Sequence, residues 1–349
     1  MNICYLLEST ELCGGVRVVF DQANALQKRG HNVIIRSITG NDKWYPYDTN
    51  IQYVSTLEEP FQPDFKPDVI IGTYWTTIPA AIKLNAPLTF HLCQGYEGSF
   101  PEFQEQKDAI DSIYKTPIPK LSIGPWLTKC LVQEFGKNSF KIYEVGQIVD
   151  TDLFRPPSFF KRLYNVFQKQ CNRILMVGSF HIKVKGIPCG LMAIKILREK
   201  GIPLKVIRVT TENSHTEENS ITPIDEMYIK ISPNKMKKIY NASHLLVAPS
   251  SPQEGFGLPF AEALACGLPV AATPIPSYLS FANKKNYALF AQEDNPISLA
   301  HTILQLILNR WLRFKFQLMG PKVVAKKFSS ECVAQKLEKA FYEYKSLAI

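Results

Sequence analysis

Two carboxylates, Glu254 and Glu262, stand eight residues apart around a glycine-rich turn in the segment 249–273 (PSSPQEGFGLPFAEALACGLPVAAT). A helix that begins near Leu258 would carry Glu262 and leave Glu254 in the preceding loop, because eight residues span a little over two helical turns. Both carboxylates can then point into one site. Carboxylate oxygens accept hydrogen bonds from hydroxyls, and a sugar and a ribose both offer neighbouring pairs of them.

The start of the same helix is suited to an anion. The backbone N–H groups of Phe256, Gly257 and Leu258 would point outward there, where the helix dipole also favours negative charge. A diphosphate fits this position, and hydroxyl-binding carboxylates beside it indicate a nucleotide sugar. The alternative interpretation is that Glu254 is a solvated loop residue and Glu262 a surface charge of the helix.

The elements around this turn must hold it in place. The apolar run His244–Ala248 predicts a buried strand before the turn, and Leu268–Ala272 predicts the strand that follows the helix. Cys266 and Gly267 are expected to end the helix, since glycine is the usual residue at a left-handed stop. A unit of strand, loop, helix and strand binds ligands at the carboxyl ends of a parallel sheet.

The order E-G-F-G-L-P-x-x-E-A-x-A-x-G-x-P-V resembles the E-x7-E signature of the retaining, GT-B-fold glycosyltransferases of family four (glycosyl transferases group 1). The resemblance implies an α/β fold of two Rossmann-like domains whose parallel sheets face each other across a cleft. It also implies that Glu254 contacts the donor sugar hydroxyls and Glu262 the ribose hydroxyls. The amides of Phe256, Gly257 and Leu258 would contact the sugar and the diphosphate.

A second segment, 176–186 (MVGSFHIKVKG), offers cations for the diphosphate. Lys185 precedes Gly186 at the start of a predicted helix, where its charge can stabilise a leaving diphosphate. The family commonly has V-G-R followed by K-G, but Ser179 stands where the arginine is usual. Lys183 is the nearest replacement by sequence, with a solvated loop charge as its alternative. If neither lysine reaches the phosphate, we expect low or absent activity.

Near the amino terminus, Gly14 and Gly15 follow the predicted strand Ile3–Leu7 and open the first helix. A backbone without side chains can approach a ligand closely there, although a plain turn has the same composition. The resemblance places this loop across the cleft from the donor diphosphate, so Gly14 and Gly15 are predicted donor-binding residues. Arg17 would reach a phosphate or an acidic acceptor, or be a solvated helix residue. The pattern is not G-x-G-x-x-G, which argues against a dehydrogenase.

His91 lies at the end of the predicted strand Leu88–Leu92. A histidine at the carboxyl end of a parallel strand is well placed to hydrogen-bond a substrate, and a packed ring is the alternative. We predict His91, Glu254 and Lys185 as the catalytic residues.

Further acceptor-side residues come from the resemblance. Gln94, Tyr96 and Glu97 resemble a Q-x-Y-E element of some rhamnosyltransferase-like members. Ser122, before the predicted helix Pro125–Phe135, falls where the family has a small hydroxyl residue facing the cleft. With Arg17, these residues form the predicted acceptor side.

The chain of 349 residues is long enough for two domains. Strands alternate with helices in both halves, which implies parallel sheets. A composition break at Arg155–Ser158 (RPPS) separates the halves. The predicted parts are an acceptor-side domain at 1–154, a linker at 155–172, a nucleotide-sugar-binding domain at 173–329, and a helix crossing back to the first domain at 330–349.

The net charge of +9 is uneven. Residues 1–150 carry 13 Lys and Arg against 17 Asp and Glu, a net charge of −4, so the remainder carries +13. A basic half suits a phosphate-bearing donor and also an anionic membrane surface. No Arg-rich stripe with interleaved aromatic residues is present, which argues against nucleic acid.

The basic segment Asn309–Lys327 allows two interpretations. We predict a domain-packing helix that is broken at Gly320-Pro321, with a membrane-surface helix as the alternative. The acidic first half argues against strong docking on anionic lipid. Weak peripheral contact at the inner face of the membrane is the corresponding expectation.

The first residues, MNICYLLESTE, predict a strand and not a signal peptide, and no apolar run reaches the length of a membrane span. The eight cysteines are scattered singly, which favours free thiols in a cytoplasmic protein. Asp150-Thr151-Asp152 forms a D-x-D, and with a diphosphate it would bind Mg or Mn. Its surroundings resemble the family's G-x-D-x-x-x-F-x-P junction, so we predict a structural role, no metal and no cofactor.

The leading hypothesis is a hexosyltransferase-type enzyme of cell-surface polysaccharide or glycoconjugate synthesis. It would move a sugar from a nucleoside diphosphate to a hydroxyl of a glycan or lipid-linked acceptor, with retention of configuration. The resemblance implies that the departing phosphate, held by Lys185, helps to deprotonate the acceptor. The alternatives are another GT-B enzyme, an epimerase or phosphorylase, and a nucleotide-sugar-binding subunit without catalysis, the latter because of Ser179.

Overall fold

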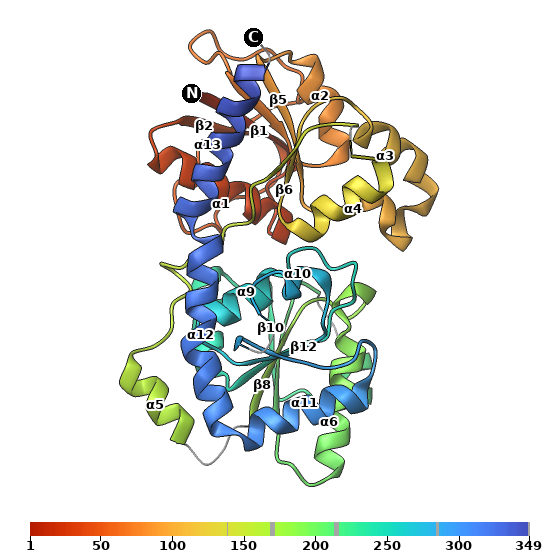
Figure 1. Cartoon of the computed structure of the whole chain (residues 1–349), viewed down its shortest axis with the longest axis vertical. Coiled ribbons are helices and arrows are strands. Elements are labelled where there is room, and N and C mark those ends of the chain that lie inside the picture. Colours follow the sequence, from red (N-terminus) through yellow and green to blue (C-terminus); the bar gives the residue numbers. More distant parts are fainter. Residues whose placement is uncertain (138, 168–171, 213–215, 284–285, 348–349) are drawn as a thin grey trace. The chain divides into compact units, whose positions relative to one another are not determined.

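The computed structural model describes residues 1–137, 139–167, 172–212, 216–283 and 286–347. The chain forms two compact units, Met1–Ile148 with Phe328–Ile349, and Val149–Lys327. We call them the first and the second domain (Figure 1). Each contains one sheet whose strands all pair in parallel, so the predicted α/β fold with two parallel sheets is confirmed. The domains divide at 148/149 and 327/328, whereas the sequence predicted boundaries at 154 and 329.

The sheet of the first domain has the strand order β3-β2-β1-β4-β5-β6-β7. The chain reverses its direction of travel across the sheet between β1 and β4, and ligands of such sheets bind where the strand order reverses. The strands are β1 (Asn2–Ser9), β2 (Asn32–Thr39), β3 (Ile51–Tyr53), β4 (Val69–Gly72), β5 (Leu88–Cys93), β6 (Lys120–Ser122) and β7 (Ile142–Glu144).

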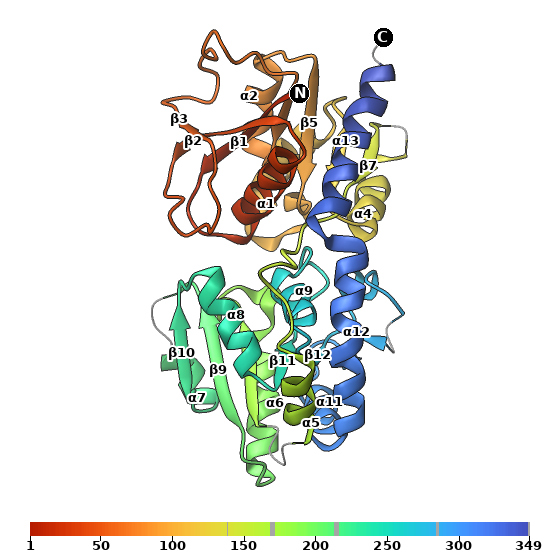
Figure 2. The same cartoon turned by 90° about the vertical axis from the view of Figure 1, so that its left-hand side faces the viewer.

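A helix from the far end of the chain completes the first domain. Arg29, just after α1, is paired with Glu331 at 2.6 Å and with Glu338 at 2.7 Å, both on α13. The two helices therefore lie side by side, as Figure 2 shows. The helices of this domain are α1 (Gly14–Lys28), α2 (Ile78–Lys83), α3 (Lys107–Tyr114), α4 (Pro125–Phe135) and α13 (Ser330–Leu347), with short 3-10 turns η1 (Trp75–Thr77), η2 (Glu97–Ser99) and η3 (Pro101–Gln106).

The sheet of the second domain has the order β10-β9-β8-β11-β12-β13, and its reversal lies between β8 and β11. The loops that follow these two strands meet at one edge of the sheet, and they carry the two segments predicted to bind the donor. The strands are β8 (Arg173–Val177), β9 (Lys205–Thr210), β10 (Glu226–Ile229), β11 (Leu245–Ala248), β12 (Val270–Ala272) and β13 (Leu289–Phe290).

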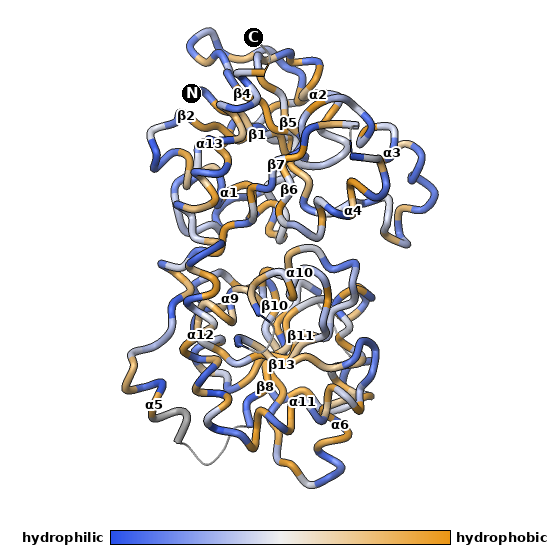
Figure 3. Tube along the Cα trace, viewed as in Figure 1, coloured by the Kyte–Doolittle hydropathy of each residue, from blue (hydrophilic) through white to orange (hydrophobic). Residues whose placement is uncertain are grey.

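Apolar side chains of α6 and α11 pack against this sheet, among them Leu191, Ile194, Leu299 and Ile303. Figure 3 shows the hydrophobic residues running through the middle of each domain, with hydrophilic residues along the loops. The helices are α5 (Phe159–Phe167), η4 (Lys183–Lys185), α6 (Ile187–Glu199), α7 (Thr216–Ile221), α8 (Pro233–Ala242), α9 (Leu258–Ala265), α10 (Pro276–Leu279), α11 (Pro296–Leu308) and α12 (Arg310–Phe328).

The predicted break at Gly320-Pro321 is wrong, because α12 continues through both residues. A Cβ on Gly320 would lie 2.8 Å from the Leu264 carbonyl oxygen, so glycine allows α12 to pack closely on α9. Pro321 has no N–H and leaves the Gln317 carbonyl without its helical donor. Arg162 of α5 donates to that carbonyl at 3.4 Å, so a tertiary contact replaces the helical hydrogen bond.

Other elements also differ from the prediction. The predicted linker 155–172 contains α5, and its residues 168–171 lie outside the described ranges. Strands β3, β10 and β13 were not predicted. All three lie at sheet edges, where one-sided pairing and partial exposure leave little hydrophobic pattern. Over the described ranges, no helix combines the length and apolar character needed to cross a membrane.

Candidate active site

Two loops at the β8/β11 reversal are held against each other. The first contains η4 and ends at Gly186, and the second is Pro249–Gly257, between β11 and α9. Ser251 N donates to the Val184 carbonyl at 2.9 Å. A Cβ on Gly186 would lie 1.9 Å from the Pro249 carbonyl oxygen, so only glycine permits this approach. The sequence thereby fixes the segment with Lys185 beside the segment with the two glutamates.

This contact brings two predicted catalytic residues together. Lys185 Nζ donates to Glu254 Oε1 at 2.8 Å, and the two side chains are 25% and 9% exposed. The second carboxylate oxygen, Glu254 Oε2, is buried and has no hydrogen-bond partner among the described residues. Both side chains line a small cavity with Ser250 and Tyr278. The cavity therefore holds a cation and an unused acceptor.

Helix α9 begins at the predicted residue, Leu258, and its first turn borders the same cavity. Gly257 caps the helix at φ 73°, and a Cβ there would lie 2.4 Å from the Tyr278 ring, which stacks on Phe260 at 3.9 Å. Pro259 has no N–H and Phe260 N donates to the Gly257 carbonyl at 3.0 Å, so within this turn Leu258 supplies the amide that the helix leaves to an anion. The predicted left-handed stop after α9 is confirmed, since Gly267 has φ 69°.

Glu262 lies in the middle of α9 and is 3% exposed. Tyr240 of α8 donates to Glu262 Oε2 at 2.9 Å and to the Pro259 carbonyl at 3.3 Å. Tyr240 thus fixes the carboxylate to the first turn of the helix. The sequence gave no signal for this role, because the contact joins residues 22 positions apart. Phe256 is also buried, against Phe281 at a ring distance of 5.2 Å.

The position that the family usually fills with arginine holds Ser179, whose hydroxyl lies 3.2 Å from that of Thr211. Lys183 is exposed on η4. Arg208 is fully buried, pairs with Glu218 at 2.6 Å and donates to the Gly178 carbonyl at 2.7 Å. It therefore supports the start of the loop and is not a substitute for the missing cation.

In the first domain, two predicted groups meet at the start of α1. Gln94 Nε2 donates to the Gly15 carbonyl at 3.1 Å. Gly14 is the first residue of α1, and a Cβ there would meet no atom within 4 Å. Arg17 Nε lies 3.7 Å from Asp21 Oδ2, one helical turn on. The glycine pair and Gln94 are therefore neighbours, while Arg17 is near a carboxylate of its own helix.

His91 lies inside the first domain with no exposed surface. Its ring contacts Tyr114 at 4.7 Å, and neither ring nitrogen has a hydrogen-bond partner among the described residues. Burial, together with the charge of Lys120, holds the pKa of His91 well below its usual value, so the ring is neutral. The structure does not place His91 where it could touch a substrate, contrary to its predicted catalytic role.

Three predicted acceptor-side residues are also internal. Tyr96 and Glu97 are 4% and 7% exposed, and Tyr114 donates to Glu97 Oε2 at 2.6 Å. Burial raises the pKa of Glu97. The Ser122 hydroxyl is fully buried and donates to the Gly124 carbonyl at 3.0 Å. These side chains stabilise the domain and face no open surface.

Trp75 and Thr76, which the sequence did not single out, follow β4 at the β1/β4 reversal of the first sheet and are candidate binding residues by position. Both are partly exposed, and the Thr76 hydroxyl has no hydrogen-bond partner within the described ranges. The signal that could have found them is their position directly after a buried parallel strand.

Asp150, of the D-x-D, has a local structural role. Its Oδ1 accepts the backbone N–H groups of Asp152 at 3.1 Å and Leu153 at 2.9 Å, which stabilises a turn. Across the described residues, no three His, Cys, Asp or Glu side chains gather as a metal site would require. The absence of a metal and of a cofactor stays a prediction.

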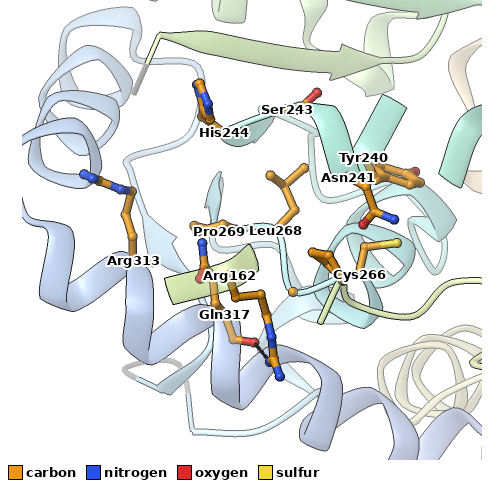
Figure 4. Close-up of a pocket in the computed structure, with 12 residues that line it drawn as sticks. Arg162, Tyr240, Asn241, Ser243, His244, Cys266, Leu268, Pro269, Arg313 and Gln317 are labelled. Atoms are coloured by element: carbon orange, nitrogen blue, oxygen red, sulfur yellow. Dashed lines mark hydrogen bonds between the residues drawn. The ribbon is translucent and has the colours of Figure 1, made fainter. Parts of the chain in front are cut away.

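A separate pocket lies at the opposite end of α9, where Cys266 and Gly267 end the helix (Figure 4). His244 lines it, and His244 Nδ1 accepts the backbone N–H of Asn172 and of Arg173, each at 3.1 Å. Burial lowers the pKa of His244, as do two nearby arginines. The remaining lining includes Arg162, Tyr240, Asn241, Arg313 and Gln317. Tyr240, whose hydroxyl donates to Glu262, is thus also part of the wall of this pocket.

Comparison with known proteins finds a family match within the second domain. Residues 171–309 match the family model described as glycosyl transferases group 1. The capsular polysaccharide biosynthesis glycosyltransferase CapM of Staphylococcus aureus is 27% identical over 190 residues, 52% of this chain and 49% of that protein. The match thus spans about half the length of this curated relative.

Solved structures match over the whole chain. Sucrose-phosphate synthase from Thermosynechococcus elongatus has a TM-score of 0.79 at 15% identity and covers 99% of both chains. HepE from Anabaena, in complex with UDP-glucose, has a TM-score of 0.78 at 12% identity and covers 98% of this chain and 100% of its own. At such identities the likeness shows the fold, and the predicted GT-B fold is confirmed.

Proposed function

We propose that this chain is a retaining glycosyltransferase that moves a sugar from a nucleoside diphosphate to an acceptor hydroxyl. The observation that carries the proposal is the ion pair of Lys185 and Glu254 beside the first turn of α9. One buried oxygen of Glu254 has no hydrogen-bond partner among the described residues. It can accept a hydrogen bond from a sugar hydroxyl. The match of residues 171–309 to group 1 glycosyltransferases and the UDP-glucose complex of HepE support the same ligand class.

In this proposal, the nucleotide sugar separates the ion pair. The diphosphate takes Lys185 and the amides at the start of α9, and the sugar hydroxyls take the carboxylate of Glu254. The ribose hydroxyls bind Glu262, which Tyr240 orients. Before the donor binds, Lys185 and Glu254 neutralise each other. When it binds, each exchanges this partner for a hydrogen-bonding group of the donor.

The reaction itself depends on charge stabilisation and on positioning. As the bond between sugar and phosphate breaks, negative charge grows on the diphosphate, and Lys185 stabilises it. The departing phosphate oxygen accepts the proton of the acceptor hydroxyl, which attacks on the same face of the sugar. Retention of configuration follows from that shared face. No metal is part of this scheme.

The acceptor is proposed to be a glycan or a lipid-linked glycan of the cell surface. The support is that the relative CapM is a glycosyltransferase of capsular polysaccharide biosynthesis. The first domain would bind the acceptor with residues that follow β4 and β5, namely Trp75, Thr76 and Gln94.

The decisive variant is Glu254→Ala. It should lower turnover by about 100-fold or more, because the sugar loses its charged acceptor, while the free energy of unfolding changes by less than about 2 kcal/mol. UDP-, GDP-, dTDP- and ADP-sugars should first be screened by thermal shift, since a ligand at 100 times its Kd stabilises by about 2.7 kcal/mol. Transfer to extracted glycolipid is then measured with the best donor. Near-normal turnover in the variant would contradict the assignment.

A subunit that binds nucleotide sugar without catalysis is the second candidate. Ser179 in place of the usual arginine favours it, because Arg208 is occupied by Glu218 and Gly178. Ser179→Arg distinguishes the two. A large gain in donor hydrolysis or transfer in the variant, over a wild-type protein that binds but does not react, would support the second candidate.

A further inference from the structure

We propose that the second domain docks on an anionic lipid surface through α5 and the start of α12. This inference concerns where the protein binds and not what it catalyses, so it stands independently of the transfer reaction. The docking surface consists of exposed apolar residues and exposed cations of one domain. Its members are Phe159, Phe160, Lys161, Leu308, Arg310, Trp311 and Lys315.

The apolar exposure is unusually large for side chains of this size. Phe160 is 81% exposed, Leu308 73%, Trp311 60% and Phe159 49%. Single exposed apolar residues are common on proteins, but several aromatic ones on adjoining elements mark an interaction site. Trp and Phe are also common on the membrane-facing side of helices that lie between lipid headgroups and acyl chains.

Ring contacts connect the aromatic residues of α5 to α12. Phe159 contacts Phe314 of α12 at a ring distance of 6.4 Å, and the neighbouring Phe160 ring lies 6.1 Å from that of Phe159. Trp311 is three residues before Phe314 on the same helix and therefore on the same side of it. In Figures 1 and 2, α5 lies near the lower part of α12, at an angle to it.

The position of α5 is set by a defined contact. Pro321 cannot donate to the Gln317 carbonyl, and Arg162 of α5 does so instead at 3.4 Å. Together with the ring contact between Phe159 and Phe314, this hydrogen bond fixes α5 against α12. Phe160 is thereby presented outward by a fixed helix.

The charge of the surface selects the partner. No Asp or Glu occurs between Asp152 and Glu199 or between Asp294 and Glu331, the two stretches that contain α5 and α12. Lys161, Arg310 and Lys315 are all exposed. Exposed aromatic residues among exposed cations are the composition of helices that lie in the surface of anionic membranes. A second copy of this chain would bring the same positive charge against it, which disfavours self-association here.

The test is co-sedimentation of the full chain with vesicles. Binding should be strong with phosphatidylglycerol mixed into phosphatidylcholine and weak with phosphatidylcholine alone. The double variant Phe160→Ser with Trp311→Ser should weaken binding about tenfold or more, because two apolar side chains lose their insertion. Ile297→Ser is the matched control. Ile297 is 62% exposed at the other end of α11, and its loss should leave binding unchanged.

The electrostatic part has its own pair of variants. Arg310→Glu and Lys315→Glu should each weaken vesicle binding by more than about fivefold. The control is Lys195→Glu, which changes an exposed lysine of α6 and should have little effect. Wild-type tryptophan fluorescence should shift to the blue on adding anionic vesicles, and the shift should be lost in Trp311→Ser.

Three results would overturn the proposal. The first is no preference for anionic vesicles, and the second is binding that the two pairs of variants leave unchanged. The third is a dimer of the wild-type chain in sedimentation velocity that Phe160→Ser dissociates, since the surface would then serve contact between copies. All the substituted side chains are exposed, so thermal unfolding of each variant should match the wild type and exclude misfolding as a cause.

Discussion

At the scale of the residue, the proposed donor site depends on how each carboxylate is held. Glu254 is paired with a lysine, whereas Glu262 is bound by a neutral tyrosine hydroxyl from another helix. The ion pair can separate when a diphosphate competes for the lysine. The tyrosine hydroxyl carries no positive charge that a diphosphate would attract, so its hydrogen bond to Glu262 need not be exchanged when the ligand binds. Tyr240 is therefore a positioning residue for the proposed ribose contact.

Replacing Tyr240 by phenylalanine tests this. The variant removes one donor from a buried carboxylate, so the nucleotide Kd should rise about fivefold to tenfold, corresponding to about 1 kcal/mol. Isothermal titration calorimetry measures it. Tyr5→Phe, which removes a buried hydroxyl bonded to Gln22 at 3.1 Å in the first domain, should reduce stability by a similar amount without changing nucleotide affinity. Equal Kd values for wild type and Tyr240→Phe would refute the positioning role.

His91 predicts a pH dependence of stability. Burial holds its pKa well below the value of about 6.5 expected in the unfolded chain. The stabilisation from the neutral ring is complete above about pH 6.5 and is lost as the pH falls below it, because the unfolded state then binds a proton that the folded state does not. The slope is at most about 1.4 kcal/mol per pH unit.

Urea unfolding at pH 7.5, 6.5 and 5.5 measures this effect. In His91→Phe the decline on acidification should be smaller than in the wild type, since an aromatic ring remains to pack on Tyr114 without a titrating group. His301→Phe removes an exposed histidine of α11 and should leave the slope as it is. An undiminished slope in His91→Phe would show that another group causes the acid sensitivity.

At the scale of the element, α9 connects the site to the core. Its cap, Gly257, has a positive φ and lies against Tyr278, while six of its eight residues are buried. A helix this apolar is fixed by packing on β11 and β12, so its amides and Glu262 are placed by the core of the domain.

Gly257→Ala should therefore lower the stability of the domain by more than the backbone strain alone would. A residue with a side chain at positive φ costs about 1–2 kcal/mol, and here the new Cβ must also displace the Tyr278 ring. Gly201→Ala is the control, since Gly201 has φ 79° but no atom within 4 Å of an added Cβ. Both variants should lose stability in urea unfolding, and Gly257→Ala should also bind nucleotide at least about tenfold more weakly. Equal affinity in the two variants would contradict the role of this cap.

At the scale of the whole molecule, the chain forms two units with separate cores, and the first is completed by α13 from the far end of the sequence. All residues proposed to bind the donor's diphosphate and sugar, including Lys185, Glu254 and Glu262, belong to the second unit. Its core contains α6, α11 and α12. Binding and transfer should therefore be separable.

A fragment of residues 149–327 should fold and bind the nucleotide with a Kd within about tenfold of that of the full chain, but transfer no sugar. Circular dichroism and calorimetry measure folding and binding, and a product assay measures transfer. The complementary deletion of residues 330–349 removes Arg29's partners Glu331 and Glu338 and should destabilise the first domain. A folded fragment without nucleotide affinity would show that the first domain is required for the donor site.

By itself, the sequence determined the parallel sheets, the start of α9 at Leu258, its glycine stop and the proximity of the two donor segments. These features follow from local patterns and from the rule that loops at a strand-order reversal meet. Only the tertiary structure decided which polar residues are reachable. His91 and Ser122 lie near the carboxyl ends of β5 and β6, and Glu97 follows β5, as ligand-binding residues would, yet all three are buried. The tertiary structure also decided the roles of Tyr240 and α12. These roles arise from contacts with α9 and α5, which are distant in sequence. Burial and long-range hydrogen bonds depend on what the rest of the chain places nearby, and no local pattern records that.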